Sequence, residues 1–356
     1  MIDHGYNWGT LEQAISKDHL ITFNSMRRAL LRGFLPALLS WTSAPSVSAQ
    51  KPDRVAFGTN WRAQAEHGGF YQALATGLYR RGGLDVTIRQ GGPQINSAQL
   101  LAAGRLDFNM GASLFGALNY LQSGVPIVTT AAIFQKDPQI LMAHPDQGHD
   151  SLPALKGKPI MISAGAQSTY WQFLKHRFGY TDAQIRPYTF QLAPFLADKK
   201  AIQQGYLTSE PFKAEQAGVK PEVLLLADGG YTSYTTTIET RADVVRDKPD
   251  LVQRFVDASI EGWYGYLDGD PGPANRLIKR DNPDMTDGLI AYAIAAMKRH
   301  GIVVSGDALT LGIGAMTDAR WKDFFDIMSS AGVFPPTLEY RRAYTLQFVN
   351  KKVGMK

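Results

Sequence analysis

Short apolar runs alternate with amphipathic stretches from Arg54 onward, and this alternation predicts strands that are each followed by a helix. Four runs in the first third have the length of buried strands: Val55–Gly58, Leu84–Arg89, Leu106–Gly111 and Ile127–Phe134. Apolar residues at helical spacing, closed in part by glycines, predict the helices between them: Gly69–Arg80, Ser97–Ala103 and Ala112–Gln122. This order is typical of parallel α/β units.

A second series of the same kind begins near His144. It predicts strands over Pro159–Ile162, Gly205–Thr208 and Val223–Ala227, a helix marked by Phe173, Leu174 and Phe178, and a helix over Ala197–Gln204. A β-branched run, Thr235–Ile238, then precedes a helical last third: Pro249–Tyr266, Ala274–Lys279, Asp287–His300, Asp318–Ala331 and Leu338–Phe348. We therefore expect two lobes and a cleft: residues 50–142 begin the first lobe, 143–233 form the second, and 234–356 return to the first and add the C-terminal helices.

The N-terminal residues follow a different pattern. Residues 1–25 show no clear apolar period, which predicts a non-native or misannotated extension, whereas Arg27, Arg28, the apolar stretch Gly33–Trp41 and Val47–Ala49 follow Met26 in the order of a signal peptide. We expect a signal peptide at 26–49, cleavage near Ala49 and a periplasmic protein. The alternative is an amphipathic first helix. No later apolar run is long enough to cross a bilayer, so we expect no stable membrane insertion.

Composition removes several classes of function. The 37 Lys and Arg residues are scattered among 32 Asp and Glu residues, and the net charge of +5 forms no basic run, so we expect no nucleic-acid partner. The absence of cysteine excludes disulfides, thiolate nucleophiles and iron–sulfur clusters. The seven histidines lack the spacing of metal ligands, and no Gly-x-Ser-x-Gly motif surrounds a candidate serine. We expect no metal, no cofactor and no enzyme activity.

The stretch Asn60–Tyr71 holds the first candidate ligand-binding residues. Ligands of such sheets lie beyond the carboxyl ends of the strands, and this stretch follows a predicted strand. Trp61 and Tyr71 offer aromatic faces, while Asn60 and His67 offer directional hydrogen bonds, a mixture typical of a small-molecule pocket. The alternative is that Trp61 and Tyr71 are core aromatics and His67 a hydrogen-bonded buried histidine.

Other candidates occupy equivalent positions after later strands: Gly92, Pro93, Gly111, Ala112, Ser113, Phe134 and Gln135. In the second lobe the loop Gly165–Thr169 offers backbone N–H groups to a dipolar or negative group, with Gln167, Ser168, Thr169 and Tyr170 as candidates, although Ser168 or Thr169 could simply cap the helix. Glu210 precedes a proline beyond a strand end, where it could bind an amine or ring N–H or be a surface carboxylate.

Two further tyrosines are candidates. Tyr231 and Tyr234 follow a predicted glycine turn at Asp228-Gly229-Gly230, and this pattern suggests a hinge or another aromatic wall.

The residues assembled so far carry a family resemblance. Its carriers are Asn60-Trp61 with His67–Tyr71, Gly83–Val86, Gly91–Pro93, Ala102–Phe108, and Gln204–Tyr206 with Ser209–Phe212. On these the sequence resembles the NMT1/THI5-like periplasmic solute-binding proteins of ABC importers, a group with binders of thiamine pyrimidine precursors and riboflavin and relatives for taurine, alkanesulfonates and nitrate. The resemblance covers the chain from about Arg54 to the C-terminal helices.

The resemblance implies an α/β, type II periplasmic-binding-protein fold, with two lobes that close on a solute in a hinged cleft. It implies a monomer that delivers a pyrimidine-like nitrogen heteroaromatic to an ABC permease and its ATPase. Trp61, Tyr71 and Glu210 match the aromatic and acidic positions of pyrimidine binders, and Gly165–Thr169 matches the sulfonate or phosphate loop of relatives. That loop has no Arg or Lys, which favours a neutral solute over a dianion.

Three alternatives remain beside this interpretation. The first is a taurine- or sulfonate-type binder of the same family, and the second is a periplasmic adaptor that presents a solute to a sensor kinase. The third is a thiamine-pyrimidine synthase, which the resemblance connects with a cysteine-rich iron motif and a pyridoxal phosphate lysine. The absence of cysteine and the predicted export signal argue against that enzyme.

Overall fold

The computed structural model of the protein describes residues 51–92 and 95–355. The predicted N-terminal extension, the predicted signal peptide and Pro93 lie outside these residues. Within the described residues, ten strands form two five-stranded sheets, each of which mixes parallel and antiparallel pairs. We call each sheet with the helices connected to its strands a lobe.

The first sheet has the strand order β2-β1-β3-β10-β4. Its strands are β1 (Asp53–Gly58), β2 (Leu84–Arg89), β3 (Phe108–Gly111), β4 (Ile127–Phe134) and β10 (Thr235–Arg241). β1 runs parallel to β2 and β3, whereas β10 runs antiparallel to β3 and β4. The prediction of parallel units is therefore confirmed for β1 to β4, which all run in one direction, whereas β10, for which no direction was predicted, enters the sheet from the other lobe and runs against them.

The second sheet has the order β7-β6-β8-β5-β9. Its strands are β5 (Gln139–Ala143), β6 (Ile160–Ile162), β7 (Ile185–Pro187), β8 (Ile202–Tyr206) and β9 (Glu222–Leu225). β6 runs parallel to β7 and β8, and β5 runs antiparallel to β8 and β9. The two sheets thus repeat one plan, in which one antiparallel strand lies between the parallel strands and the last edge strand.

Two short segments connect the sheets. Residues 135–138 lead from β4 to β5, and residues 226–234 lead from β9 to β10. We call these the crossing segments. The predicted lobe limit at 142/143 falls inside β5, and the limit at 233/234 falls directly before β10.

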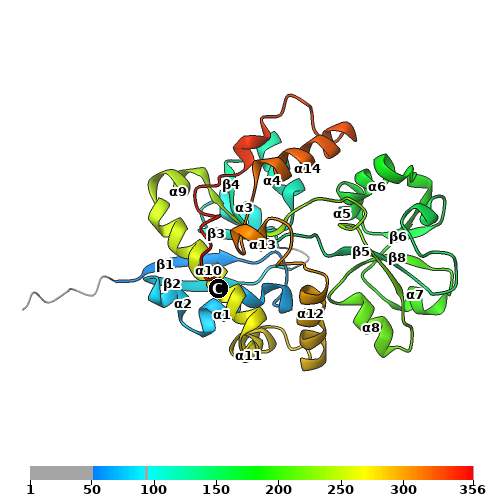
Figure 1. The fold of residues 1–356 in the computed structure, drawn as a ribbon, viewed down its shortest axis with the longest axis horizontal. Coiled ribbons are helices and arrows are strands. Elements are labelled where there is room, and N and C mark those ends of the chain that lie inside the picture. Colours follow the sequence, from blue (N-terminus) through cyan, green and yellow to red (C-terminus); the bar gives the residue numbers. More distant parts are fainter. Residues whose placement is uncertain (1–50, 93–94, 356) are drawn as a thin grey trace, which may run out of the picture. The chain divides into compact units, whose positions relative to one another are not determined.

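Helices of the first lobe come from both ends of the described chain. They are α1 (Gly68–Ala75), α2 (Leu78–Arg81), α3 (Ser97–Ala102), α4 (Leu114–Gln122), α9 (Ala242–Asp247), α10 (Pro249–Asp268), α11 (Gly272–Asp281), α12 (Asp287–Arg299), α13 (Ala308–Leu311) and α14 (Asp318–Ser330). Figure 1 shows α1 and α11 beside the long α10, and α1 packs on both α10 and α11. The return segment therefore completes the core that the N-terminal elements begin.

An aromatic stack lies at the centre of this core. The ring of Phe255 on α10 stacks on Phe108 of β3 with centroids 4.1 Å apart and on Tyr79 with centroids 5.2 Å apart. It meets Phe57 of β1 edge-on at 5.3 Å. All four side chains are buried, so this cluster fixes α10 against the sheet.

The helices of the second lobe are shorter: α5 (Ala164–Gln167), α6 (Tyr170–Phe178), α7 (Ala193–Ala197) and α8 (Glu210–Gln216). The described part of the chain also has 3-10 turns: η1 (Ala65–His67), η2 (Pro153–Leu155), η3 (Asp182–Gln184) and η4 (Tyr340–Ala343). Figure 1 shows α5 to α8 in green around β5, β6 and β8. Because these helices have only one to three turns, loops make up much of this lobe.

Three predicted helices were wrong in part. The helix over Gly69–Arg80 divides into α1 and α2, because Gly77 between them has a left-handed φ of 74°. The helix over Ala197–Gln204 is replaced by the end of α7 and the start of β8, where Gln203 and Gln204 are buried. Of Leu338–Phe348 only η4 is helical.

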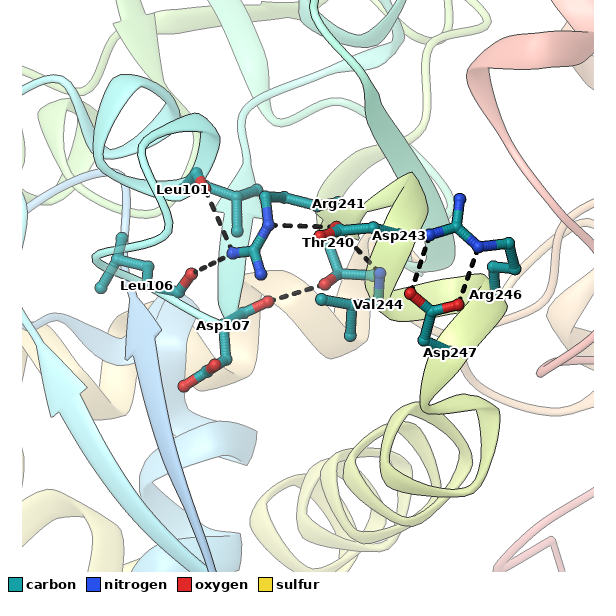
Figure 2. A network of polar contacts seen from close by, with 9 residues as sticks. All are labelled: Leu101, Leu106, Asp107, Thr240, Arg241, Asp243, Val244, Arg246 and Asp247. Atoms are coloured by element: carbon teal, nitrogen blue, oxygen red, sulfur yellow. Dashed lines mark hydrogen bonds and ion pairs between the residues drawn. The ribbon is translucent and has the colours of Figure 1, made fainter.

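The far end of β10 is anchored to the loop before β3. Figure 2 shows the Arg241 guanidinium donating to the backbone oxygens of Leu101 and Leu106, at 3.4 and 3.1 Å. The Thr240 hydroxyl donates to the Asp107 backbone oxygen at 2.7 Å. These bonds hold the C-terminal end of β10. The crossing segment from the other lobe enters at its N-terminal end.

Candidate functional site

Trp61 follows β1 and faces an aromatic residue of the other lobe. Its ring centroid lies 6.4 Å from that of Phe190, and the two planes are inclined by 36°. Trp61 is 37% exposed and Phe190 is 64% exposed, which is unusual for side chains of this size. Tyr188 flanks Phe190 at 5.1 Å. The two lobes thus present a pair of exposed aromatic faces to each other.

The backbone at Phe190 supports a functional interpretation of this pair. Phe190 has a φ of 61°, a left-handed conformation that bulky residues rarely adopt. Such a conformation costs free energy and tends to persist at ligand sites, where the surrounding structure holds it. The loop after β7 therefore holds an apolar ring in an exposed position at a conformational cost.

A second contact between the lobes joins Glu66 to Thr208. The Thr208 hydroxyl donates to a carboxylate oxygen of Glu66, which lies in η1 directly before α1, and both side chains are buried. Desolvation raises the pKa of Glu66 to about 7, and the nearby Glu210 adds to the increase. A carboxyl group that titrates near neutral pH therefore lies at the junction of the two lobes.

Glu210, a predicted ligand residue, begins α8 near Glu66 and is partly buried. Its Oε2 accepts hydrogen bonds from the Tyr206 backbone N–H, at 2.8 Å, and from the Ser209 hydroxyl. These bonds hold the carboxylate in a fixed direction. Its negative charge helps to raise the pKa values of Tyr170, Tyr188 and Tyr206 as well as that of Glu66.

Asp137 brings a third carboxylate to the same tyrosines. It lies in the first crossing segment, is 4% exposed, and accepts a hydrogen bond from the Gln139 backbone N–H at 2.9 Å. Desolvation raises its pKa to about 7. Its charge adds to the desolvation that raises the pKa values of Tyr170, Tyr206 and Tyr231. Acidic and phenolic groups thus gather where the lobes join, an arrangement suited to a solute that donates hydrogen bonds.

Tyr170 and Tyr231, both predicted candidates, lie together in this region. Their rings meet edge-on at 6.4 Å, and both are buried. The Tyr170 hydroxyl has no hydrogen-bond partner among residues 51–92 and 95–355. A buried hydroxyl without a partner is available to a solute that reaches it.

The predicted loop Gly165–Thr169 uses most of its polar groups internally. The N–H groups of Ala166 and Gln167 donate to the Ser163 backbone oxygen, and that of Thr169 donates to the Ala166 oxygen. The hydroxyls of Ser168 and Thr169 both donate to the Gly165 oxygen at 3.2 Å. Gln167 and Thr169 are partly buried and Ser168 is exposed. The loop forms a short capped helix that offers few free donors to an anion.

Three predicted residues belong to the connection between the lobes. Phe134, Gln135 and Tyr234 are fully buried. Arg320 of α14 donates to the Gln135 backbone oxygen at 2.7 Å and to the Thr232 backbone oxygen at 2.6 Å, and thereby binds both crossing segments. Its guanidinium lies 5.0 Å from the centre of the Tyr234 ring. Of the two interpretations of the tyrosine pair, these contacts favour a hinge for Tyr234.

His67 and Tyr71 point into the first lobe. Tyr71 is buried and its hydroxyl donates to Asp281 at 3.1 Å, which matches the alternative of a core aromatic. His67 is also buried, and burial lowers its pKa to about 3, so the ring is neutral. Neither ring nitrogen finds a hydrogen-bond partner in the described part of the chain, contrary to the alternative of a hydrogen-bonded histidine.

The remaining candidates of the first lobe lie around a cavity. Asn60 and Ala112 line a hollow of about 450 Å³ beyond the ends of β1 and β3. Gly111 is buried next to Glu239, and Ser113 immediately precedes α4. Gly92 forms an isolated bridge with Ile95, another residue of the cavity. Asn60 and Ala112 thus lie at a concave surface beyond the ends of two strands.

Sequence reasoning missed five residues of this region: Glu66, Asp137, Tyr188, Phe190 and Tyr206. Glu66 stands within the stretch that was singled out, but one carboxylate in a polar loop has no distinctive pattern. Asp137 lies in a Lys-Asp-Pro sequence that is typical of a surface turn, yet it is buried. The two closely spaced aromatics Tyr188 and Phe190 in a short polar segment were the signal that could have been used.

The described residues show neither a metal site nor a membrane span. No group of three or more His, Cys, Asp or Glu side chains in that part of the chain is arranged to hold a metal ion. None of the helices in the described ranges combines the length and the apolar composition that crossing a bilayer requires.

Comparison with known proteins gives consistent results. The family model described as NMT1/THI5 like matches residues 64–271, more than half of the chain. The riboflavin-binding protein RibY of Chloroflexus aurantiacus is 23% identical over 320 residues, which cover 86% of this chain and 90% of RibY.

Solved structures share the fold. The periplasmic aliphatic sulphonate binding protein SsuA from Escherichia coli superposes with a TM-score of 0.62 at 12% identity, over 82% of this chain and 92% of SsuA. The desulfurization enzyme DSZB gives a TM-score of 0.56 at 13% identity, over 83% of this chain and 97% of DSZB. The predicted fold class, with two α/β lobes of the periplasmic-binding-protein type, is confirmed. At these identities the likeness concerns the fold alone.

Proposed function

Because the chain belongs to the NMT1/THI5-like family, as its sequence indicated, and has the fold of periplasmic solute-binding proteins, we propose that it is the solute-binding component of an ABC importer. It captures a small nitrogen-containing heteroaromatic between its lobes and delivers it to a permease that works with an ATPase. It acts as a monomer in the periplasm after removal of a signal peptide near Ala49. Binding and release are its whole reaction, and it is not an enzyme.

The aromatic pair Trp61 and Phe190 is the observation that carries this proposal. For a flat ring to stack between two others, the two outer rings must lie about 7 Å apart, which is two van der Waals contacts of about 3.5 Å each. The observed separation of 6.4 Å between the ring centroids is slightly smaller, so a small opening of the lobes admits one ring. Each lobe contributes one face, and the stacked solute therefore favours the closed arrangement.

The polar groups around this pair favour a neutral or weakly cationic ring with hydrogen-bond donors. Glu210 and Asp137 supply carboxylate acceptors, and the Tyr170 hydroxyl is unpaired within the described residues. The loop Gly165–Thr169, by contrast, has neither a cationic side chain nor many free N–H groups. A sulfonate or phosphate dianion would find three carboxyl groups nearby and no bidentate cation.

One other class of function, and one relative, bear on this proposal. A thiolate-based enzyme is excluded because the chain has no cysteine. RibY is named for riboflavin, a nitrogen heteroaromatic, and this relative is similar over most of both chains. That name agrees with a heteroaromatic solute for this chain and adds flavins to the compounds to be tested.

A thermal-shift screen of the purified chain from Gln50 onward tests the proposal. The panel contains aminopyrimidines, riboflavin, purines and alkanesulfonates, and native mass spectrometry first shows whether a solute copurifies. A ligand at 100 times its Kd stabilises the folded state by about 2.7 kcal/mol, which a melting curve detects. We expect stabilisation by a heteroaromatic and none by sulfonates. Stabilisation by sulfonates alone would contradict the heteroaromatic site and keep the family.

A further inference from the structure

The cavity beside Asn60 lies next to the proposed ring site and has a composition of its own. It measures about 450 Å³, far more than the roughly 30 Å³ that one water molecule takes up. Polar residues from four places in the chain line it: Asn60 after β1, Asn96 and Ser97 at the start of α3, Asn109 on β3 and Tyr120 on α4. Asn60 directly precedes Trp61, so the cavity and the aromatic pair are adjacent.

We propose that this cavity holds a hydroxylated substituent, a polyol or sugar-like chain, that the heteroaromatic ring carries. The inference rests on the proposed function, because it assigns a second part of the same solute. It narrows the solute class from nitrogen heteroaromatics in general to those that bear such a chain.

The chemistry of the lining supports a neutral, hydroxyl-rich group. Amide and hydroxyl side chains both donate and accept hydrogen bonds, as the hydroxyls of a polyol do. None of the lining residues within the described ranges is charged. A phosphate or carboxylate would find no cation there, and an alkyl chain would leave the polar groups unpaired.

Asn109 gives the cavity a fixed acceptor. It is 2% exposed, and its Nδ2 donates to Glu239 Oε2 at 2.9 Å. This bond sets the orientation of the amide, and Asn109 Oδ1 is left without a hydrogen-bond partner among the described residues. A buried acceptor without a partner is rare, and a solute hydroxyl that enters the cavity can supply the missing donor.

Glu239 and Gly111 hold Asn109 in place. Glu239 is fully buried on β10, opposite Asn109 of β3, and its Oε1 lies against Gly111 so closely that a Cβ at position 111 would be 2.0 Å away. Desolvation raises the pKa of Glu239 to about 7, while the hydrogen bonds from Asn109 and Thr237 lower it. A buried carboxyl at this position is difficult to explain by packing alone. Its evident role is to direct the Asn109 amide.

Matched pairs of ligands separate this inference from the proposed function. The pairs are riboflavin and lumiflavin, uridine and uracil, and adenosine and adenine, each with and without the hydroxylated chain. Kd values come from titration calorimetry. We expect at least one ring to bind and its hydroxylated partner to bind about tenfold more tightly, the equivalent of one or two added hydrogen bonds.

Two variants on the rim of the cavity locate the effect. Asn60→Ala and Tyr120→Phe remove polar side-chain groups of the cavity lining, and both residues are only partly buried, so both variants should fold. Each should reduce the preference for the hydroxylated ligand severalfold, and Tyr120→Phe should leave the Kd of the bare ring unchanged. Asn119→Ala, an exposed neighbour on α4, is the control and should change neither value.

The outcomes are distinct. If no ring of any pair binds, the proposed function fails and this inference fails with it. If rings bind equally well with and without the chain, the inference alone is overturned. If the preference exists but both rim variants keep it in full, the hydroxylated chain binds elsewhere and the cavity is not its site. Asn109→Ser, accepted only if its melting curve shows a folded protein, tests the fixed acceptor directly.

Discussion

The two lobes share a strand plan but differ in what they bury. The first lobe surrounds a 20-residue helix, α10, with stacked aromatic rings. The second lobe has helices of four to nine residues and keeps two glutamines buried in the centre of β8. One of them, Gln204, accepts a hydrogen bond from the Ser163 backbone N–H at 2.5 Å. Stacked rings around one long helix dominate the first core, whereas the second core has short helices and two buried amide side chains in one strand.

This difference indicates a division of labour. A core of stacked rings resists deformation and gives Trp61 and Asn60 a firm base. Short helices and long loops leave the second lobe more freedom in the positions of Tyr188, Phe190 and Glu210. We therefore expect the first lobe to be the more rigid of the two.

Truncation of one buried ring in each lobe should break the comparison most severely. Phe255→Ala should destabilise the protein by about 3–5 kcal/mol, at the upper end because three rings lose their contact with Phe255. Phe195→Ala in α7, whose ring stacks on His144 alone, should lie at the lower end. Urea unfolding measures both. Phe255→Leu is the matched control, and equal losses in the two lobes would contradict the contrast.

The contact between the lobes should make stability depend on pH. The pKa of Glu66 is raised from 4.5 to about 7, so the folded protein keeps a proton there that the unfolded chain releases. The stability that the folded state gains from this bound proton is fully present below pH 4.5 and is lost as the pH rises to about 7. The loss amounts to about 1.4 kcal/mol per pH unit for one proton.

Glu66→Gln should therefore flatten the decline in unfolding free energy between pH 5 and 7. Unfolding titrations at pH 5, 6, 7 and 8 measure this slope. The pKa values of Asp137 and Glu239 are also raised, so part of the decline in unfolding free energy should remain in this variant. Glu261→Gln, an exposed position on α10, is the control. Identical slopes in parent and Glu66→Gln would show that Glu66 is not protonated in the folded state.

Solute binding should depend on one residue from each lobe to a similar degree. Trp61→Ala and Glu210→Gln should each weaken binding of the solute by about 1–3 kcal/mol, through lost stacking and a lost charged acceptor. Calorimetry measures the affinity, and melting curves should stay close to that of the parent because neither side chain is in a core. Trp61→Phe should keep most of the affinity. If both variants bound as tightly as the parent, the proposed site would be wrong.

The smallest effect is expected from the ion pair between the crossing segments. Lys136 and Asp228 lie 2.8 Å apart, with side chains 32% and 58% exposed. Asp228→Asn should cost less than about 1 kcal/mol, because solvent screens such pairs. Unfolding at low and high salt measures it, and the difference from the parent should vanish at high salt. A large, salt-independent loss would place this pair in the structural hinge beside Arg320.

Much of the first lobe was predictable because its signals are local. The bounds of β2 and β4 match the apolar runs, and α10, α12 and α14 follow clear helical periods. The failures have tertiary causes. Two neighbouring glutamines, Gln203 and Gln204, are typical of an exposed helix face, and only the folded chain supplies the partner that lets Gln204 be buried in a strand. The sequence does not indicate the direction of β10, which is set by the crossing from the other lobe.

The candidate site was predictable only where a strand end marks it. Asn60, Trp61 and Ala112 follow strands and lie at exposed or concave surfaces. Three other candidates also stand at strand ends but are buried where the two lobes are connected: Phe134, Gln135 and Tyr234. Asp137 and Phe190 depend on burial and on a left-handed backbone that no periodicity records.

The position of β10 has a consequence for the order of folding. It pairs Thr237 with Gly111 and Ile238 with Met110, across the entire second lobe. The first sheet therefore lacks its fourth strand until more than two thirds of the chain has been synthesised, although β1 is made near the start. Pairings between residues so distant in sequence form slowly. The first lobe is thus completed after the second. In a nascent chain, β1 to β4 therefore wait for β10 while the whole second lobe is synthesised.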